Sequence, residues 1–231
     1  MKVYFIPGLG ASSNCFKFIT LPEGFEKVYI EWFTPEGNET LEEYTRKLAE
    51  SIDTSEPFIL VGYSFGGVIV QEMNKFLNPQ KTILIASMKN DQQIPNLFKI
   101  IKALRFAYWF PMRFFSSQGL LSYAFARSVY YKSKNQKIKE TLKIEEYLSQ
   151  TNPKYLKWSI NAISSWKSTI QCKNIFQIHG TKDPIFPYKK IRKSYEKNRQ
   201  HLFTIPEANH ILVLEKPKKV NEAFKNILLN N

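Results

Sequence analysis

Three residues that could act together as a nucleophile, a base and an orienting acid occur in the order Ser64, Asp183, His210. Ser64 stands in Gly62-Tyr63-Ser64-Phe65-Gly66, which matches the pattern G-x-S-x-G. A serine hydroxyl is a weak nucleophile at neutral pH, so it needs a histidine as general base and a carboxylate that orients the imidazole. The sequence therefore predicts acyl transfer through a covalent intermediate on Ser64.

The glycines around this serine fit a sharp turn between a strand and a helix. The turn follows the apolar run 58–63 and opens an apolar helical pattern, which raises the weight of the motif. A nucleophile held at such a turn needs a strained backbone and close approach of neighbouring chain. Close approach is allowed by the flanking glycines, Gly62, Gly66 and Gly67. The same geometry directs the amide of Phe65 and the positive end of the helix toward an oxyanion.

Other residues compete for these roles, and the alternatives stay open at this point. The chain has three histidines, and His179 and His201 lie on or beside predicted strands, which favours structural roles for them. Asp91 follows the fourth predicted strand and Glu207 lies near the candidate base in sequence, so each is an alternative acid. The alternative for the serine is a small packing residue at a turn.

A second glycine-rich turn, residues 8–13, follows the first predicted strand. It approximates the dinucleotide-binding pattern G-x-G-x-x-G, and Glu31 lies where an acid could hold a ribose. However, Ser13 replaces the third small residue, Pro7 precedes the first glycine, and the residues that follow are poor for a long helix. Nucleotide binding is disfavoured, and no G-K-[ST] sequence follows a glycine-rich turn to suggest a P-loop.

The elements that must position these residues alternate along the chain, in a pattern typical of a mostly parallel sheet flanked by helices. Six strands are predicted, at residues 2–6, 27–32, 57–63, 81–87, 174–180 and 201–206. Helices are predicted at residues 40–52, 65–77 and 216–229. The first of them begins at a capping box, because Glu43 stands three residues after Thr40.

Residues 89–172 interrupt this alternation. The stretch is helical by pattern, in four pieces at residues 94–110, 119–132, 135–150 and 153–168. We predict a helical cap inserted between the fourth and fifth strands, over a core formed by residues 1–88 and 173–231. Helices placed at the strand ends would form a lid over the site.

Composition narrows the class of protein. The chain has 231 residues, 43% of them hydrophobic and 15% aromatic, which is enough to bury a sizeable core in one domain. The apolar run at its start is too short for a signal peptide. The longest apolar stretch, 106–112, is too short to span a bilayer. Cys15 and Cys172 lie far apart without paired spacing, so neither a disulfide framework nor a zinc site is predicted. We expect a cytoplasmic protein that does not span a membrane.

Most of the net charge of +13 lies in the predicted cap. Residues 89–171 contain 14 Lys and Arg against 4 Asp and Glu, a net charge of +10. Lys99, Lys102 and Arg105 repeat every three residues beside a broad apolar face. Three interpretations remain: a solvated basic face on a lid, a docking site for an anionic substrate or acidic carrier protein, or a contact with a membrane surface. Nucleic acid binding is not expected, because no recognised motif accompanies the charge.

These motifs resemble those of the α/β-hydrolases with a helical cap, and the match extends over nearly the whole chain. The resemblance implies an α/β-hydrolase fold with Ser64 as nucleophile, His210 as general base and then general acid, and Asp183 as the carboxylate that orients the imidazole. Their order along the chain is the one that this architecture has.

The resemblance also gives the first glycine-rich turn a role. "PGLG" stands where such enzymes often have His-Gly-x-Gly, which implies an oxyanion hole formed by the backbone amides of Leu9 and Phe65. Pro7 departs from the usual histidine, but the donors are backbone groups. The antiparallel strands that often precede this loop are not seen, which implies a compact, six-stranded version of the fold.

The implied activity is hydrolysis of a carboxylic ester or thioester with an apolar acyl chain, through an acyl-enzyme and with no metal or organic cofactor. Carbon–carbon hydrolases, lyases and peroxidases share this triad and stay open as alternatives. A ligand-binding protein of the same fold, with slow turnover or none, also stays open, although a complete triad argues against it. The sequence makes no prediction of oligomeric state.

Overall fold

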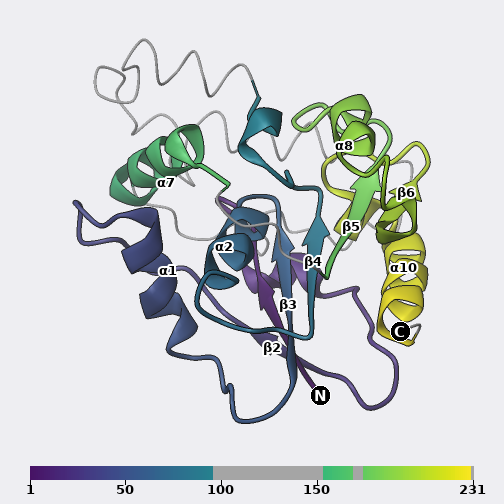
Figure 1. Ribbon diagram of the computed structural model, residues 1–231, viewed down its shortest axis with the longest axis horizontal. Helices are drawn as coiled ribbons and strands as arrows, with labels where there is room; N and C mark the ends of the chain where they lie inside the picture. The colour runs from purple at the N-terminus through teal and green to yellow at the C-terminus, as the bar shows by residue number, and fades with distance from the viewer. Residues whose placement is uncertain (96–152, 169–173, 230–231) are drawn as a thin grey trace.

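Six strands form one parallel sheet at the centre of the protein, in the order β2-β1-β3-β4-β5-β6 (Figure 1). The computed structural model describes residues 1–95, 153–168 and 174–229. The strands are β1 (Lys2–Ile6), β2 (Glu26–Tyr29), β3 (Phe58–Tyr63), β4 (Lys81–Ile85), β5 (Ile175–Gly180) and β6 (Leu202–Ile205). All five pairings are parallel. The predicted six-stranded sheet is therefore confirmed.

Two strands, β2 and β4, end two or more residues earlier than the sequence predicts. β4 stops at Ile85 because Ala86 has a φ of 44°, which an extended strand does not accommodate. β2 ends at Tyr29, although the amide of Ile30 still donates to the carbonyl of Phe5 at 3.0 Å. Both chain segments thus leave the sheet just before the residues that border the site.

The strand order places a topological switch at β1 and β3. From β1 the chain moves outward to the edge strand β2, and it then returns to β3 on the other side of β1. Ligand sites in parallel α/β sheets form beyond the carboxyl ends of strands at such a reversal. The two candidate motifs follow these two strands, since the turn 8–13 comes after β1 and Ser64 comes after β3. The topology therefore brings them to one point.

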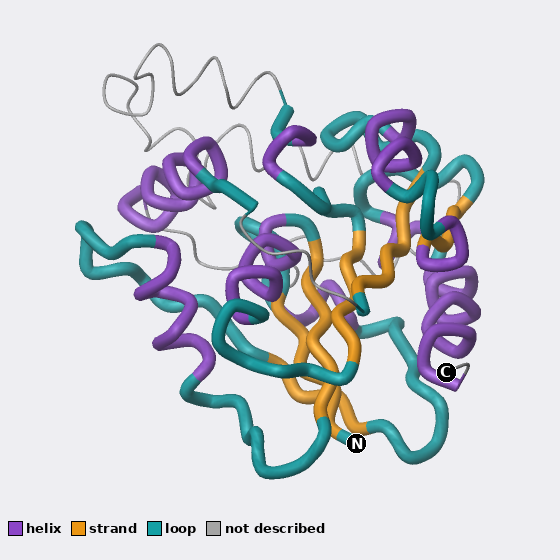
Figure 2. Tube along the Cα trace, in the orientation of Figure 1, coloured by secondary structure: helices purple, strands orange, loops and turns teal. Residues whose placement is uncertain are grey.

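Helices cover both faces of the sheet (Figure 2). One face packs against α1 (Leu41–Ala49), α2 (Phe65–Met73), α7 (Pro153–Ser165) and α8 (Tyr188–Ser194). The other packs against the short helix η1 (Ser13–Phe16), α9 (Leu212–Glu215) and α10 (Pro217–Leu229). Two further single turns are η2 (Asp91–Gln93) and η5 (Arg199–His201). Alternate strand residues face the two layers, as Phe5 and Ile6 do.

The three predicted core helices are present, and local side chains set their ends. α1 begins at the predicted capping box, in which the Glu43 amide donates to Thr40 Oγ1 at 3.2 Å and the Thr40 amide donates to Glu43 Oε2 at 2.8 Å. α2 stops at Met73 rather than at residue 77. The Asn74 side chain donates to the carbonyl of Val70 at 2.6 Å and so competes with the helical pattern there.

The predicted cap lies mostly outside the described residues, so its boundaries at 89 and 172 stay a prediction. Within it, α7 covers most of the fourth predicted helical piece, 153–168. Trp158 of α7 packs on Tyr44 of α1, and its indole N–H donates to the carbonyl of Glu39 at 2.8 Å. The end of this segment is therefore anchored on the core.

Two observations bear on the expectations from composition. Among the described residues, no helix has both the length and the apolar character needed to cross a membrane. Cys15 is free and buried, and its burial raises the pKa of the thiol well above its ordinary range. This cysteine is a packing residue of the core.

Candidate active site

Ser64 lies at the sharp turn between β3 and α2, with φ of 53° and ψ of −117°. A residue with a side chain in such a conformation carries roughly 1–3 kcal/mol of strain. Surrounding bonds hold it there: the Ser64 amide donates to the carbonyl of Ile85 at 2.9 Å, and the Ser64 carbonyl accepts from the Gly67 amide at 3.0 Å and from Ser87 Oγ at 2.7 Å. The turn is therefore braced by the end of β4.

Glycines bring the neighbouring chain close to this turn. A Cβ on Gly62 would overlap the backbone of Gly66, and a Cβ on Gly66 would overlap the carbonyl of Ile6 at the end of β1. A Cβ on Gly8 would lie 3.0 Å from the Cβ of Ser64. The start of α2 and the turn after β1 can approach each other only because these positions lack side chains.

The structure brings together the three residues of the predicted triad. His210 Nε2 lies 2.9 Å from Ser64 Oγ, and His210 Nδ1 lies 2.9 Å from Asp183 Oδ2. The other carboxylate oxygen, Oδ1, accepts the amides of Ile185 at 2.8 Å and Phe186 at 3.0 Å. Asp183 and His210 are buried, with 5% and 4% of their surfaces exposed, so these bonds are shielded from water.

The charge on Asp183 determines which nitrogen of His210 carries the proton. Burial raises the pKa of Asp183, but the pairing with His210 and the further hydrogen bonds lower it by more, so the pKa lies below its ordinary value of 3.8. An ionised carboxylate only accepts hydrogen bonds, so Nδ1 of His210 must donate. Nε2 is then free to accept the hydroxyl proton of Ser64, as a general base requires.

The loop between β6 and α9 fixes the imidazole. Tyr63 donates its hydroxyl to the carbonyl of His210 at 3.2 Å, and the rings of Tyr63 and Phe186 lie 5.7 Å and 5.6 Å from the imidazole ring. Asn209 Oδ1 accepts the amide of Ile211 at 2.7 Å, which closes the turn behind the histidine. These contacts hold the histidine in place.

The predicted oxyanion donors lie on the two turns that meet at the switch point. Leu9 belongs to the turn after β1, and Phe65 is the first residue of α2. Neither amide is paired with an acceptor among the described residues. Trp32 connects the two turns, because its indole N–H donates to the carbonyl of Gly8 at 3.2 Å and its ring stacks on that of Phe65 at 5.4 Å. Such an arrangement can bind an oxygen anion.

The four alternative residues each have another partner in the structure. His179 bonds the carbonyl of Phe186 at 2.9 Å, His201 bonds the carbonyl of Ile175 at 3.1 Å, Asp91 pairs with Lys167 at 3.1 Å, and Glu207 lies 3.8 Å from Lys182. None of these four contacts is made with Ser64.

The geometry does not favour a nucleotide at the turn 8–13. Glu31 accepts the amide of Ser13 at 2.9 Å, so this carboxylate closes the turn itself. The helix that follows, η1, has only four residues, whereas a dinucleotide fold uses a long helix whose N-terminus faces the phosphates. Within the described ranges there is also no cluster of three or more His, Cys, Asp or Glu residues that could hold a metal ion.

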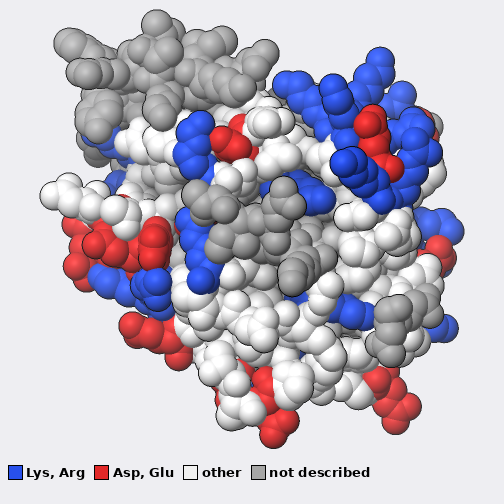
Figure 3. All heavy atoms as spheres, viewed as in Figure 1, with Lys and Arg blue, Asp and Glu red and all other residues white. Residues whose placement is uncertain are grey.

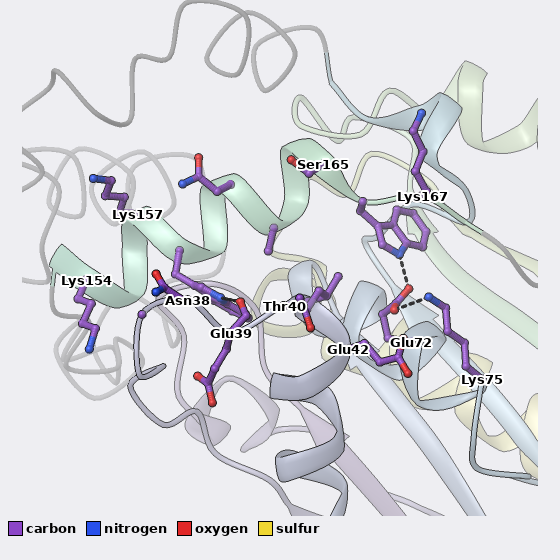
Figure 4. Close-up of a pocket in the computed structure, with 16 residues that line it drawn as sticks. Asn38, Glu39, Thr40, Glu42, Glu72, Lys75, Lys154, Lys157, Ser165 and Lys167 are labelled. Atoms are coloured by element: carbon purple, nitrogen blue, oxygen red, sulfur yellow. Dashed lines mark hydrogen bonds and ion pairs between the residues drawn. The ribbon is translucent and has the colours of Figure 1, made fainter.

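A groove with a volume of about 740 Å³ lies beside α7 and the start of α1, and its lining includes no residue of the triad (Figure 4). Four lysines and three glutamates line it, Lys75, Lys154, Lys157, Lys167, Glu39, Glu42 and Glu72. The buried carboxylate of Glu72 accepts the indole N–H of Trp166 at 2.7 Å and pairs with Lys75 at 2.6 Å. These bonds tie the segment after α7 to α2.

The residues that support the triad were not predicted from the sequence. They are Trp32, Tyr63, Ser87, Gln177 and Phe186. One signal was available: the predicted strand 174–180 has polar residues at two alternate positions, which an apolar core would not place there.

Comparison with known proteins gives structural relatives at low sequence identity. No curated protein sequence matches the chain. A thermophilic esterase from Thermogutta terrifontis aligns with a TM-score of 0.67 and 14% identity, over 99% of this chain and 89% of that chain. A bromoperoxidase from Bacillus anthracis aligns with a TM-score of 0.69 and 16% identity, over 99% and 92%. An esterase from Exiguobacterium antarcticum aligns with a TM-score of 0.68 and 16% identity, over 96% and 90%.

These structures share their fold with this chain. A sequence family also matches the chain over nearly its whole length. A model of the alpha/beta hydrolase family covers residues 3–223, from the first strand into the last helix. This chain therefore belongs to the alpha/beta hydrolase family.

Proposed function

We propose that this protein is a serine hydrolase that cleaves a carboxylic ester or thioester, with Ser64 as nucleophile, His210 as base and Asp183 as the orienting acid. One observation carries the proposal. At a strained strand-to-helix turn, the imidazole of His210 is hydrogen-bonded on one side to Ser64 and on the other to Asp183, each at 2.9 Å. Membership of a hydrolase family supports it, and the esterases among the structural neighbours favour an ester substrate.

The proposed reaction has two halves. Ser64 Oγ attacks the carbonyl carbon while His210 Nε2 takes its proton, and the Leu9 and Phe65 amides bind the oxyanion. The intermediate collapses when His210 gives that proton to the leaving alcohol or thiol. Water then attacks the acyl-enzyme with His210 again as base, and the proton returns to Ser64 as the acid leaves. Asp183 stays ionised throughout and stabilises the imidazolium.

An apolar acyl group suits the aromatic residues beside the oxyanion turns. Trp32 stacks on Phe65 with an interplanar angle of 8°, and its ring lies 5.6 Å from that of Tyr155 on α7. Trp32 and Leu9 are only partly buried, so both offer apolar surface next to the proposed oxyanion site. Burial of an acyl chain against such surface stabilises it by roughly 25 cal/mol per Å².

A charged substrate is part of the proposal. Exposed cations gather on α8 and the residues around it, beside the loop that holds Asp183 (Figure 3). They are Lys182, Lys189, Lys190, Arg192, Lys193, Lys197 and Arg199. A surface of one sign steers partners of the opposite sign, so we propose an anionic substrate, free or carried on an acidic protein, in the cytoplasm.

Peroxidase activity is the second candidate, because one of the structural neighbours is a bromoperoxidase. Hydrogen peroxide would replace water in the attack on the acyl-enzyme and release a peracid, which oxidises bromide. Bromination of an indicator dye that depends on peroxide, bromide and a carboxylic acid together would identify this reaction. Ester hydrolysis without any bromination under these conditions would exclude it.

A fluorophosphonate probe tests the proposal, since it labels only an activated serine. We expect labelling at Ser64, located by mass spectrometry, and no labelling in Ser64→Ala. A series of p-nitrophenyl esters and acyl thioesters of increasing chain length then identifies the acyl group. An unlabelled wild-type protein would point to the ligand-binding alternative, and equal labelling of Ser64→Ala would refute the role of Ser64.

A further inference from the structure

A series of hydrogen bonds connects the end of β4 with β5 next to the triad. Ser87 Oγ donates to the carbonyl of Ser64 at 2.7 Å, and Gln177 Nε2 donates to the carbonyl of Ser87 at 2.7 Å. Gln177 Nε2 also lies 3.2 Å from His179 Nδ1, and His179 Nε2 lies 2.9 Å from the carbonyl of Phe186. The series thus links the nucleophile turn to the loop that carries the acid.

The three side chains that form these hydrogen bonds occupy positions that favour apolar residues. Ser87, Gln177 and His179 are all 0% exposed. Gln177 pairs in register with Leu84 of β4, whose side chain lies in the apolar cluster on the same face. Burial of an amide or imidazole costs roughly 1–3 kcal/mol unless it is hydrogen-bonded. Polar residues at such positions indicate a demand other than packing.

The bonding partners assign the orientation of the Gln177 amide. The carbonyl of Ser87 can only accept, so the nitrogen of Gln177 must face it, and the second N–H then points to His179 Nδ1. Nδ1 is therefore an unprotonated acceptor, and the ring carries its hydrogen on Nε2, toward the carbonyl of Phe186. His179 is held as one neutral tautomer.

A neutral His179 matters because it is close to the acid of the triad. His179 Nε2 lies 3.6 Å from Asp183 Oδ2, the same oxygen that is 2.9 Å from His210 Nδ1. The ring of Tyr188 stacks on that of His179, with ring centres 6.5 Å apart. An imidazolium at His179 would be a second cation at this carboxylate and would weaken its attraction for His210. Burial also lowers the pKa of His179 below 6.5.

His179 also fixes the loop itself. Its bond to the Phe186 carbonyl holds the residue whose amide donates to Asp183 Oδ1 at 3.0 Å. Loss of this bond would free both the amide and the Phe186 ring that packs on His210. One side chain thus acts on the position of the acid and on the charge around it.

We propose that Ser87, Gln177 and His179 form a positioning network that holds the Ser64 turn and the Asp183 loop in fixed relation and keeps His179 neutral, so that Asp183 serves His210 alone. The proposal rests on the proposed function, because it assigns these residues to the support of that triad. They touch no reacting atom.

Replacement of Gln177 with a carboxylate separates charge from packing. In Gln177→Glu the new carboxylate can only accept a hydrogen bond, so it favours a proton on His179 Nδ1 and hence the imidazolium. Gln177→Leu removes both donors and leaves the ring neutral. We expect the Glu variant to lose kcat on the order of 10²-fold with little change in KM. The acidic limb of its kcat/KM profile moves to lower pH, because a second cation disfavours protonation of His210. The Leu variant keeps the wild-type limb.

Nuclear magnetic resonance reads the network without any activity. The chain has only three histidines, so their ring C–H signals can be assigned by substitution. We expect no titration of His179 in the wild type between about pH 5 and 8, where an unperturbed histidine titrates, and titration in Gln177→Glu. An ordinary titration of wild-type His179 would overturn the proposal, as would equal pH profiles for the Glu and Leu variants.

A second pair of variants covers the case in which Gln177→Glu does not fold. His179→Gln can donate to the Phe186 carbonyl and accept from Gln177 without any charge, whereas His179→Leu can do neither. We expect His179→Gln to retain most of the activity that His179→Leu loses. Equal loss in both would refute the network. Fluorophosphonate labelling of the wild type tells failure of this inference from failure of the proposed function, since it reports whether Ser64 is activated in the wild type and does not depend on how the network variants behave.

Discussion

Ser64 has a backbone conformation that glycine would adopt at lower free energy. Its φ of 53° and ψ of −117° are sustained by bonds from Ile85, Gly67 and Ser87. The strain is useful only if the side chain must project at the turn, since any other residue could relax it. Stability and function are therefore opposed at this position.

Ser64→Gly should be more stable than Ser64→Ala by about 1 kcal/mol. Alanine keeps the Cβ and its strain, while glycine relieves the strain and gives back part of the gain through its greater freedom in the unfolded chain. Urea unfolding of the two inactive variants measures the difference. A glycine variant no more stable than the alanine variant would show that the turn is unstrained.

Asp183→Asn should lower kcat/KM by roughly 10⁴-fold while the fold persists. The amides of Ile185 and Phe186 hold the Asn oxygen, so the Asn nitrogen faces His210 Nδ1 and donates to it. The imidazole then loses the tautomer that takes the Ser64 proton. Ester hydrolysis measures the effect. Loss of less than about tenfold would assign the acid role elsewhere, with Asp91 and Glu207 as the residues to replace next.

The same variant should alter the pH dependence of stability. The pKa of Asp183 is below its ordinary value of 3.8 in the folded protein, so its ionisation stabilises the fold above that value, and the contribution is lost as the pH falls through the folded pKa. The difference in unfolding free energy between wild type and Asp183→Asn should therefore narrow below about pH 4. A constant difference from pH 7 to pH 2 would contradict it.

At the scale of elements, the site depends on the close approach of α2 to the end of β1. Gly66 of α2 faces the carbonyls of Ile6 and Pro7 without room for a side chain. Because Leu9 follows β1 and Phe65 opens α2, the separation of these elements sets the separation of the two proposed oxyanion donors.

Gly66→Ala should move α2 away from the end of β1. We expect the variant to lose roughly 1–3 kcal/mol of stability and kcat on the order of 10²-fold. Gly24→Ala is the matched control. Gly24 has a φ of 87° and open space around it, so alanine there should lower stability by about 1 kcal/mol and leave kcat unchanged. Thermal unfolding and ester hydrolysis measure both. Unchanged kcat in Gly66→Ala would show that the spacing does not matter.

The elements themselves were largely predictable, because strand and helix periodicity reports burial directly. Their ends were not: Ala86 turns the chain at the end of β4 with a positive φ, and Asn74 ends α2 through a side-chain bond, and neither is a strong signal in sequence. Ser64 was predictable from its glycines. The hydrogen bond between Gln177 and Ser87 could not be predicted from the sequence, because it depends on the register of β4 with β5.

At the scale of the whole molecule, charge is less confined than the sequence suggested. Residues 89–171, which form most of the predicted cap, contain an excess of lysine and arginine. The exposed cations on α8 and around it form a further basic surface, on the core itself and beside the loop of Asp183 (Figure 3). A substrate that approaches this edge of the sheet meets positive charge.

Turnover of an anionic substrate should fall with salt, roughly tenfold in kcat/KM between about 0.01 M and 1 M, while that of a neutral ester should not. Lys189→Glu with Lys193→Glu should produce a similar fall at low salt. Lys218→Glu with Lys225→Glu makes the same change of charge on exposed positions of α10 and should have little effect. Equal effects of the two double variants would show that net charge, not the α8 surface, governs association.

The junction between β4 and β5 has a consequence for how this chain can change over evolution. The two strands pair side by side, yet residues 86–174 separate them in sequence. The entropy lost when such a segment is closed grows only with the logarithm of its length, by about 0.6 kcal/mol for each doubling. Insertions and deletions between these strands therefore bring little thermodynamic penalty to the sheet. Substrate preference can diversify in that segment beyond Ser87, while the residues that contact Ser64 stay the same.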